Sequence, residues 1–374
     1  MRSPGLLHLQ LLCAFALGAA PAQAQLATKG APGAPIRVAV ARLTHGHVAR
    51  LWARQHPDIQ IVGIYEPNGE LADRLAQRYG FDRAMVSTNL GQLLDATKPD
   101  AVVAFGSIFE HMEVVEAAAS RHVHVMVEKP LAVSVEHATR MQVLSRQYGI
   151  HLLTNYETTW YPSMLATERL IAGDSVIGPL RKVVVHDGHQ GPKEIGVSKE
   201  FFEWLTDPVM NGGGALIDFG CYGANLVTWL MHGQAPLTVT AVTQQIKPDI
   251  YPKVDDEATI VLTYPSAQAI LQASWNWPVA RKDIELYGRT GYLVAPNPTT
   301  IRLRRSESVP ETLITAPPRP APIQDEFQFL AAVVRGTVQL PATDLSSLEN
   351  NVTVVRILDA ARRSAKEGRT IVLK

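Results

Sequence analysis

The apolar residues in the first half of the chain alternate between short β-branched runs and longer segments with helical spacing. The short runs predict strands, and apolar residues three or four positions apart predict the helices between them. Strands separated by helices of about 10 to 15 residues are typical of a parallel, doubly wound sheet with right-handed crossovers. The predicted strands are Ile36–Ala41, Ile59–Tyr65, Asp100–Phe105, Val123–Val127 and His151–Thr154, and the predicted helices are Gly46–Gln55, Gly69–Tyr79, His111–Ser120 and Val135–Gln147. We therefore expect an α/β domain over residues 36–155.

After Pro162 the pattern changes to longer alternating segments with hairpin-type spacing. This pattern predicts a mostly antiparallel sheet in a second domain over residues 156–335, an α+β arrangement, with a Pro-rich surface connection at 310–322. We expect residues 336–374 to form a helix and strand that return to the first domain, with Gly368 as the helix stop. The predicted strands are Leu180–Asp187, Leu237–Gln245, Asp256–Tyr264, Gln268–Trp275, Asp283–Tyr287 and Ile371–Leu373, and the predicted helices are Gly220–Met231, Asp325–Arg335 and Leu345–Glu367.

The first 24 residues have the pattern of a secretory signal peptide. Arg2 is their only charged residue, Leu11–Ala20 is apolar, and Ala22-Gln23-Ala24 has the small-x-small form that precedes cleavage. The alternative is a short N-terminal helix of the first domain. No Arg-Arg pair is present, which favours the Sec route and a periplasmic or secreted protein. Residues 25–35 then form a flexible arm, and Cys221 is the sole cysteine after cleavage, which excludes an intrachain disulfide.

Length and charge narrow the class of protein. A chain of 374 residues exceeds the usual size of one core, so two domains are expected. Lys and Arg number 35, as do Asp and Glu, and no basic block stands out, so we expect no nucleic-acid partner. No apolar run beyond the first 25 residues is long enough to cross a bilayer, so we expect no membrane partner.

Glu128-Lys129-Pro130 closes the apolar run at Val123–Val127. The carboxyl end of a strand in an open parallel sheet faces the crevice where ligands bind. Lys129 there could lower the pKa of a neighbour, orient a hydroxyl group or form a salt bridge with Glu128. A solvated strand end is the competing interpretation of this motif taken alone.

A second motif begins at the glycines 212–214 and ends at Tyr222. Asp218 and Tyr222 are four residues apart, so they share a face of a helix. A Tyr phenol has a pKa near 10 and needs a neighbouring cation to become a base at neutral pH. Lys129 could supply that charge and Asp218 could orient either group, so we predict Lys129, Asp218 and Tyr222 as catalytic residues. Without Lys129, a core Tyr with a capping Asp would be the better interpretation.

The first predicted strand-to-helix turn carries an eroded dinucleotide-binding fingerprint. Gly-x-Gly-x-x-Gly is expected there, but Arg42, Thr44 and His47 occupy the glycine positions, with Gly46 one residue early. Thr44 and the backbone N–H groups of His45, Gly46 and His47 could still bind a phosphate. His45 and His47 could also be read as metal ligands, but no carboxylate lies near them in sequence, and we predict no metal.

Glu66 ends the second predicted strand. An acidic residue there accepts hydrogen bonds from the adenosine ribose and repels a 2′-phosphate, which favours NAD over NADP. A solvated carboxylate is the alternative. Together with the first turn, Glu66, Glu128 and Lys129 are the predicted cofactor-binding residues.

These residues resemble the glucose–fructose oxidoreductase, inositol dehydrogenase and rhizopine-catabolism (Gfo/Idh/MocA) oxidoreductases over essentially all of Ile36–Leu373. The likeness includes His111-x-Glu113, Glu128-Lys129-Pro130, the Gly-Gly-Gly-x-x-x-Asp-x-Gly segment and a terminal helix at Ile357–Gly368, which in the family packs back on the nucleotide domain. Most members end the second motif with His, whereas Tyr222 is similar to the exported glucose–fructose oxidoreductase branch. The resemblance implies a Rossmann domain, catalysis by Lys129, Asp218 and Tyr222, and a cofactor held by Glu66 and the first turn.

We therefore expect an NAD(P)-dependent oxidoreductase that acts on a sugar or polyol hydroxyl. One alternative is an NAD-dependent glycoside hydrolase of the same fold, which oxidises, eliminates, adds water and reduces back. Another is a sugar-binding protein with a degenerate nucleotide site. Because free NAD is scarce outside the cytoplasm, export favours a tightly bound, recycled cofactor.

Trp275 and Trp277 stand two apart near the end of a predicted strand, so both indoles are expected on one face. The resembled family pairs through its second-domain sheets. We therefore expect these residues in the interface of a homo-oligomer, a dimer or tetramer, rather than in a sugar-stacking wall.

Overall fold

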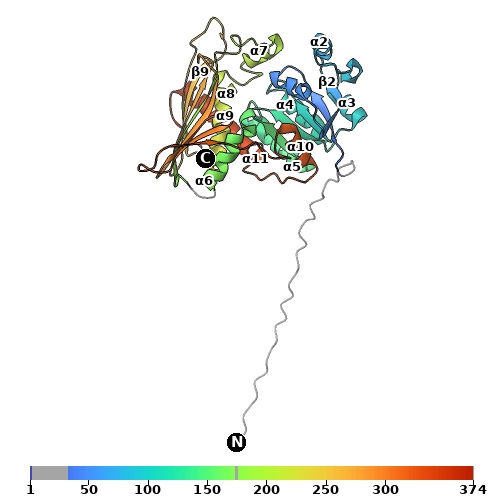
Figure 1. Ribbon diagram of the computed structural model, residues 1–374. Coiled ribbons are helices and arrows are strands. Elements are labelled where there is room, and N and C mark those ends of the chain that lie inside the picture. The colour runs from blue at the N-terminus through green and yellow to red at the C-terminus, as the bar shows by residue number, and fades with distance from the viewer. Residues whose placement is uncertain (2–32, 173–175, 374) are drawn as a thin grey trace.

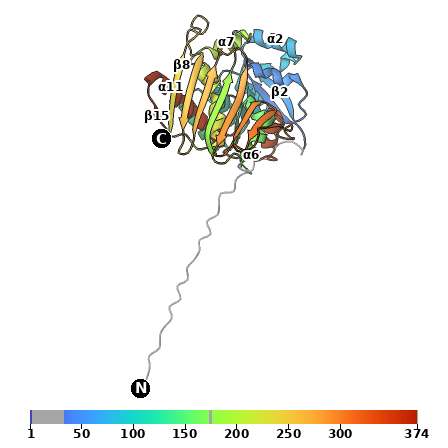
Figure 2. The same cartoon turned by 60° about the vertical axis from the view of Figure 1, so that its left-hand side comes forward.

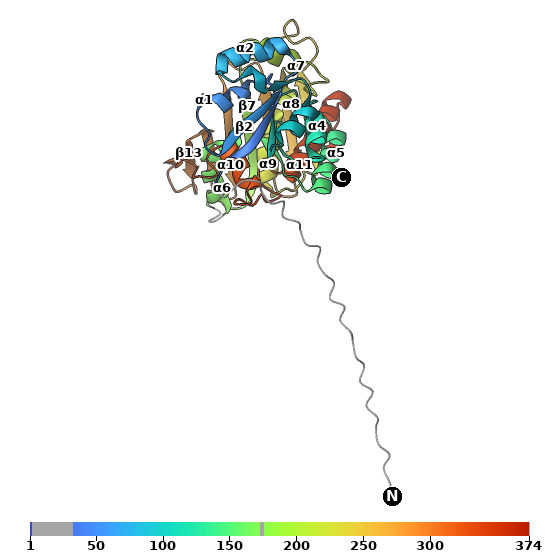
Figure 3. The same cartoon turned by 90° about the vertical axis from the view of Figure 1, so that its right-hand side faces the viewer.

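The computed structural model describes Met1, residues 33–172 and residues 176–373, and its first domain is a parallel sheet between two layers of helices (Figures 1 and 3). The strands follow the order β3-β2-β1-β4-β5-β6, which reverses direction between β1 and β4 and so places a crevice there. Its elements are β1 Ile36–Ala41, η1 Gly46–Ala49, α1 Arg50–Ala53, β2 Ile59–Tyr65, α2 Gly69–Tyr79, η2 Arg83–Met85, β3 Val86–Ser87, α3 Leu90–Thr97, β4 Ala101–Ala104, α4 His111–Ala119, β5 His124–Glu128, α5 Val135–Tyr148 and β6 Leu152–Asn155.

The second domain is a nine-stranded sheet in the order β14-β13-β12-β11-β7-β10-β9-β8-β15. Helices cover its inner face, which looks toward the first domain, and the outer face is open (Figure 2). Every residue of the central helix α9 is buried, and the helix packs against β7, β10 and α11. The elements of the second domain are η3 Glu157–Trp160, α6 Pro162–Ala172, β7 Leu180–Gly188, α7 Lys199–Leu205, α8 Ala215–Asp218, α9 Gly220–Leu230, β8 Thr238–Gln244, β9 Glu257–Thr263, β10 Gln268–Ser274, β11 Arg281–Gly288, β12 Tyr292–Asn297, β13 Thr300–Arg304 and β14 Thr312–Thr315.

The C-terminal segment joins the two domains through α10 (Glu326–Val334), α11 (Leu348–Glu367) and β15 (Ile371–Val372). Helix α11 contacts α5 of the first domain and both α9 and β8 of the second. It ends at Gly368, whose φ of 64° fits the predicted helix stop. The long helix thus lies between the domains.

The fold class is confirmed: a parallel Rossmann-type sheet precedes a mostly antiparallel sheet. Each strand predicted in the first domain is present within one or two residues. The strands β3, β12 and β13 and the helices α3, α6, α7 and α8 were not predicted. The predicted helix Gly46–Gln55 is a 3-10 turn followed by one short α-helical turn. Part of the predicted connection 310–322 is the edge strand β14, which pairs with β13.

Two predictions about the C-terminal segment are wrong. Strand β15 pairs with β8 of the second sheet and does not return to the first domain. Helix α10, which we assigned to the second domain, packs Phe327 and Leu330 against Val38 and Val40 of the first. Its apolar face covers the side of the parallel sheet that α4 and α5 leave open. The helix therefore belongs to the first domain by packing, although it follows the second domain in the sequence.

Across the described ranges, no helix combines the length and apolar character needed to span a membrane. The predicted signal peptide (1–24) and most of the predicted flexible arm (25–35) lie outside the described residues.

Candidate functional site

Lys129 and Asp218 form a buried ion pair where the two domains meet. Lys129 lies just beyond β5 and Asp218 ends α8; their side chains are 6% and 7% exposed. The Lys129 ammonium donates to Asp218 Oδ1 and, at 2.9 Å, to the Asp218 backbone carbonyl. The indole Nε1 of Trp275 donates to Asp218 Oδ2 at 2.9 Å. Two motifs 89 residues apart thus meet as the sequence predicted.

Both groups of this pair carry their charge. Burial alone would lower the pKa of Lys129, but the Asp218 carboxylate outweighs it and raises that pKa above its ordinary value. Burial alone would raise the pKa of Asp218, but Lys129 and the Trp275 hydrogen bond lower it. The pair is therefore an ammonium and a carboxylate that stabilise one another away from water.

Tyr222 lies in the first turn of α9 beside this pair. The ammonium of Lys129 is 5.2 Å from the centre of its ring, and that of Lys282 is 4.7 Å away. Our prediction that Lys129 lowers the pKa of the phenol is not supported. Burial raises the pKa of Tyr222 well above its usual value, and the carboxylate of Glu157 acts in the same direction. The phenol is therefore neutral.

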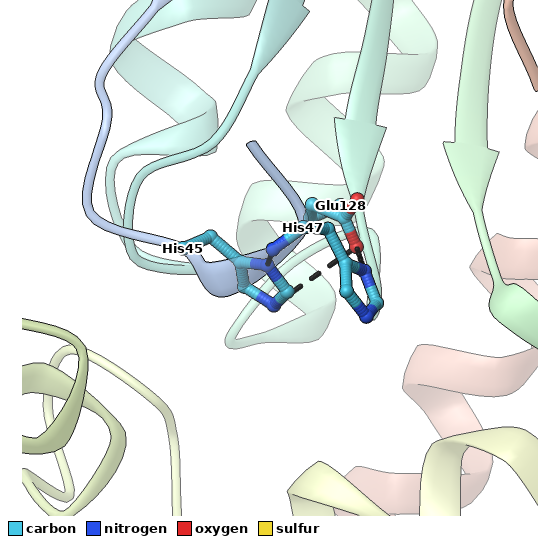
Figure 4. A group of neighbouring side chains, drawn as sticks. All are labelled: His45, His47 and Glu128. Carbon is cyan, nitrogen blue, oxygen red and sulfur yellow. Dashed lines mark hydrogen bonds and ion pairs between the residues drawn. The ribbon is translucent and has the colours of Figure 1, made fainter. Parts of the chain in front are cut away.

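Glu128 is the centre of a second cluster, at the end of β5 (Figure 4). Its Oε2 atom is 3.1 Å from His47 Nδ1 and 4.0 Å from His45 Nε2, and Asn155 Nδ2 donates to Oε1 at 2.9 Å. Burial alone would raise the pKa of Glu128, but His47, His45 and Arg50 together hold it well below its ordinary range. Glu128 is thus a buried carboxylate.

His45, His47 and Glu128 bring one potential metal-ligand atom each within 4.8 Å of one another. The tertiary structure therefore supplies the carboxylate that we judged absent from the neighbourhood of the two His residues. His45 Nδ1, however, accepts a hydrogen bond from the His47 backbone N–H at 3.1 Å, which puts the ring proton of neutral His45 on Nε2, facing Glu128. This nitrogen would have to lose its proton to bind a metal, and the arrangement is better explained as a hydrogen-bonded network.

The first turn differs from the predicted phosphate cradle. The His45 N–H donates to the Phe105 carbonyl at 2.8 Å, and the His47 N–H is occupied by His45. Thr44 Oγ1 donates to the same Phe105 carbonyl at 3.3 Å and accepts a bond from Trp204 Nε1 at 3.1 Å. These groups satisfy each other within the turn and its neighbours.

Glu66 also has partners that the sequence did not indicate. Its two carboxylate oxygens accept the backbone N–H groups of Leu43 and Asn68, each at 2.9 Å, and the residue is 1% exposed. Burial raises the pKa of Glu66, while the Asn68 and Leu43 hydrogen bonds lower it. In this structure Glu66 fixes the first turn to β2. Its predicted contact with a ribose has no direct support here.

Arg42 is the side chain at this turn that suits an anionic cofactor. A Cβ atom on Gly106 would lie 2.8 Å from Arg42 Cγ, so Arg42 crosses the crevice between β1 and β4. Its guanidinium pairs with Glu110 at 2.7 Å, but Arg42 Nε is buried without a hydrogen-bond partner. This unused donor is compatible with a pyrophosphate oxygen, but the guanidinium is already held by Glu110 and, at 3.7 Å, by Glu113.

Sequence reasoning missed other polar residues of this site. Lys282 on β11 donates to Glu157 Oε2 at 2.6 Å, and Asp187 on β7 lies directly opposite Lys282. Each is an isolated polar residue, and no motif marked it. Alternation along the strands could have assigned Asp187 to the inner face, but not its neighbours.

Trp275 and Trp277 do not share a face as predicted. Strand β10 ends at Ser274, and the chain then turns Trp275 inward, where it is fully buried and bonded to Asp218. Trp277 remains half-buried, with Arg281 over its ring at 5.6 Å. Trp275 therefore belongs to the site and is not available to a subunit interface.

The first domain has the Rossmann fold, with a switch point between β1 and β4, and a buried Lys–Asp pair lies beside a phenol where the two domains meet. The sequence matches the NAD-binding Rossmann-fold domain of the GFO/IDH/MocA oxidoreductases over residues 41–156 and the GFO/IDH/MocA C-terminal domain over 165–294. The chain belongs to this family, and the protein is an oxidoreductase with an NAD-binding domain.

Known proteins similar to this chain include trans-1,2-dihydrobenzene-1,2-diol dehydrogenase of Xenopus tropicalis, 24% identical over 332 residues that cover 86% of this chain and 94% of the relative. An aldose–aldose oxidoreductase from Caulobacter crescentus, complexed with glycerol, superposes with a TM-score of 0.75 at 22% identity, over 91% of this chain and 100% of that one. An inositol dehydrogenase homologue from Azotobacter vinelandii, complexed with NAD⁺, gives a TM-score of 0.77 at 16% identity, over 91% and 98% of the two chains. These structures establish the fold.

Proposed function

We propose that the protein transfers a hydride between NAD and a hydroxyl-bearing carbon of a sugar or polyol. The observation that carries the proposal is the buried Lys129–Asp218 ion pair beside the neutral phenol of Tyr222. The relatives support the substrate class, because their names specify a diol and aldoses. The residues that would hold NAD are Arg42 at the pyrophosphate and Glu128 with Lys129 at the catalytic end.

The protonation states of Tyr222 and Lys129 indicate the role that each residue would have in catalysis. Bound NAD supplies the hydride acceptor or donor. Tyr222 would hold a proton on its phenol oxygen and donate it to a carbonyl oxygen that is being reduced. Lys129 gives two of its three N–H bonds to Asp218, which leaves the third for the same substrate oxygen. In the oxidative direction the phenol would first have to release its own proton to solvent, and only the resulting phenolate of Tyr222 could receive the alcohol proton.

The test begins with protein purified from its native compartment. Mass spectrometry of released nucleotide is expected to find NAD, and sugars or polyols are expected to change NADH absorbance. Aglycone release from a chromogenic glycoside without net NADH would favour the redox-neutral glycosidase. Sugar binding with neither nucleotide nor turnover would favour a binding protein and contradict the proposal. Titration of both cofactors tests the expected preference for NAD over NADP.

Export and cofactor retention are a second part of the proposal. The signal-peptide pattern of residues 1–24 favours a periplasmic or secreted protein, and intact-mass analysis of the mature chain is expected to place its N-terminus at Gln25. Tight NAD binding is supported by α7, which packs Phe201 on His45, with 4.7 Å between ring centres, and bonds Trp204 to Thr44.

Assembly through the outer face of the second sheet is the remaining part. This face is open and carries exposed apolar side chains such as Val242 on β8, 65% exposed, and Tyr287 on β11, 37% exposed. Trp277 lies near the end of the same sheet. An apolar face of this kind favours pairing with a second copy of the chain.

A further inference from the structure

Asp187 is a buried carboxyl group that the fold leaves unsatisfied. The residue is 1% exposed, and neither of its carboxylate oxygens has a hydrogen-bond partner. Buried polar groups in folded proteins are nearly always paired, because losing water without a replacement partner is unfavourable. The unpaired carboxyl group of Asp187, in a strand that is otherwise well packed, therefore needs a physical explanation.

The position of Asp187 connects it to the proposed active site. On β7, Val183, Val185 and Asp187 alternate toward the inner face, and the two Val residues belong to the apolar core. Asp187 is directly opposite Lys282 on β11 and beside the small Ala273 on β10. Lys282 is the same residue whose ammonium lies 4.7 Å from the centre of the Tyr222 ring.

The obvious partner of Asp187 is engaged elsewhere. Lys282 donates to Glu157 at 2.6 Å, and Glu157 is held in turn by the Tyr161 hydroxyl at 2.6 Å. Burial raises the pKa of Asp187 well above its ordinary value; Lys282 opposes this rise, and Asp283 and Glu157 add to it. The group is therefore a neutral carboxylic acid, which can donate one hydrogen bond and accept others.

A purely structural residue at this point of the inner row would be apolar, like Val183 and Val185. A carboxyl group with both oxygens unused is complementary to two neighbouring hydroxyl groups of a ligand. Its hydroxyl can donate to one, and its carbonyl oxygen can accept from the other. Unfavourable groups of this kind persist where function needs them, at the expense of stability.

We propose that Asp187 is a specificity-determining residue that binds a pair of adjacent hydroxyl groups on the substrate, and so selects vicinal diols over monohydroxy compounds. This inference rests on the proposed function and specifies its substrate class. The Asp187 side chain would hold the part of the sugar or polyol next to the carbon that lies at Lys129 and Tyr222.

The test compares Asp187→Leu and Asp187→Asn with the wild-type protein, using D-glucose, D-xylose and myo-inositol as probes. With the best probe, Asp187→Leu is expected to raise KM at least about tenfold while kcat stays within about threefold, because the lost hydrogen bonds position the substrate. Asp187→Asn is expected to keep KM within about threefold of wild type, because its amide also donates one hydrogen bond and accepts another. A monodeoxy analogue that lacks one of the two hydroxyl groups is expected to lose affinity in the wild type and to lose nothing further in Asp187→Leu. An unchanged KM in Asp187→Leu would overturn the inference.

Thermal unfolding of the ligand-free protein provides a readout that does not need activity. Asp187→Leu is expected to raise Tm, because it removes an unsatisfied buried polar group. The matched control is Asp283→Asn, one residue from Lys282 on the outer face, whose carboxylate bonds His186 at 2.9 Å and Arg281 at 2.7 Å. This variant is expected to lower Tm and leave KM unchanged.

The two proposals can fail separately. Absence of NAD-dependent turnover with every probe would reject the proposed function, whereas the Tm comparison would still decide on Asp187. A Tm that falls in Asp187→Leu as it does in Asp283→Asn would show a structural carboxylate and overturn the inference.

Discussion

At the scale of single residues, the Lys129–Asp218 pair has a structural role in addition to its proposed catalytic role. Removing one partner of a buried ion pair leaves the other charge uncompensated, which costs about 3 kcal/mol or more. We therefore expect Lys129→Met to lower turnover at least about a hundredfold, as for loss of one acid–base partner, and to lower the free energy of unfolding by about 3 kcal/mol. Steady-state kinetics and urea unfolding measure the two effects.

The double variant Lys129→Met with Asp218→Asn separates these effects. It is expected to regain most of the lost stability, because no unpaired buried charge remains, but to stay inactive. If turnover of the single variant stays within about threefold of wild type, Lys129 has no catalytic role and is only a charged residue at the end of a strand.

His111 gives a prediction for pH. It begins α4, its Nδ1 lies 3.2 Å from the Leu131 carbonyl, and its Nε2 is buried without a partner. Burial lowers the pKa of His111 from 6.5 to about 4 in the folded protein. Because the unfolded chain binds this proton more tightly, acid favours unfolding, and the stability due to neutral His111 is lost as pH falls from 6.5 toward 4.

The expected loss between pH 7.5 and pH 5 is about 2 kcal/mol from this residue. Urea unfolding at both pH values measures it, and His111→Gln is the comparison, since Gln does not titrate. If the free energy of unfolding depends equally on pH in the wild type and in His111→Gln, the loss of stability does not come from His111.

At the scale of elements, the short helix α7 lies against the first turn of the other domain. Phe201 packs on the His45 ring, and a Cβ atom on Gly46 would lie 3.7 Å from Phe201. Arg74 on α2 pairs with Glu200 at 2.6 Å on the same helix. The helix therefore covers the turn that we predict to contact the cofactor.

We expect Phe201→Ala to release NAD about five to ten times faster, since an aromatic contact of this kind is worth about 1 kcal/mol. Stopped-flow displacement of bound NAD measures the rate. The matched control is Glu203→Ala on the same helix. In the described part of the chain, the exposed Glu203 side chain pairs with Lys199, so this variant is expected to leave the rate unchanged. Equal rates in all three proteins would show that α7 does not retain the cofactor.

At the scale of the whole molecule, the open outer face of the second sheet predicts the assembly. Because Trp275 is buried within one chain, Trp277 is the one of the two predicted interface Trp residues that remains to be tested. Trp277→Ala combined with Val242→Lys is expected to give a smaller particle by size-exclusion chromatography with light scattering. Val143→Lys, at an exposed position on α5 away from this face, is the control and should keep the wild-type size.

The sequence by itself determined the order and type of most elements of both domains, because apolar periodicity is a local property of strands and helices. It also placed Lys129 at a strand end, a relation that depends on residues close together along the chain and that the structure retains. The prediction that Asp218 and Tyr222 share the face of one helix is not retained, because the chain breaks at Phe219 and divides them between α8 and α9.

Tertiary structure alone decided which groups meet and which charges they carry. Periodicity cannot bring Trp275 to Asp218 or Glu128 to His47, because those contacts depend on how separate elements pack. It also could not give the direction of the Tyr222 pKa shift, since burial between two domains raises that pKa while the nearby ammonium groups lie against the ring. For the same reason β15 joins the second sheet: a two-residue strand carries too little pattern to specify its partner, and the end of α11 places it beside β8.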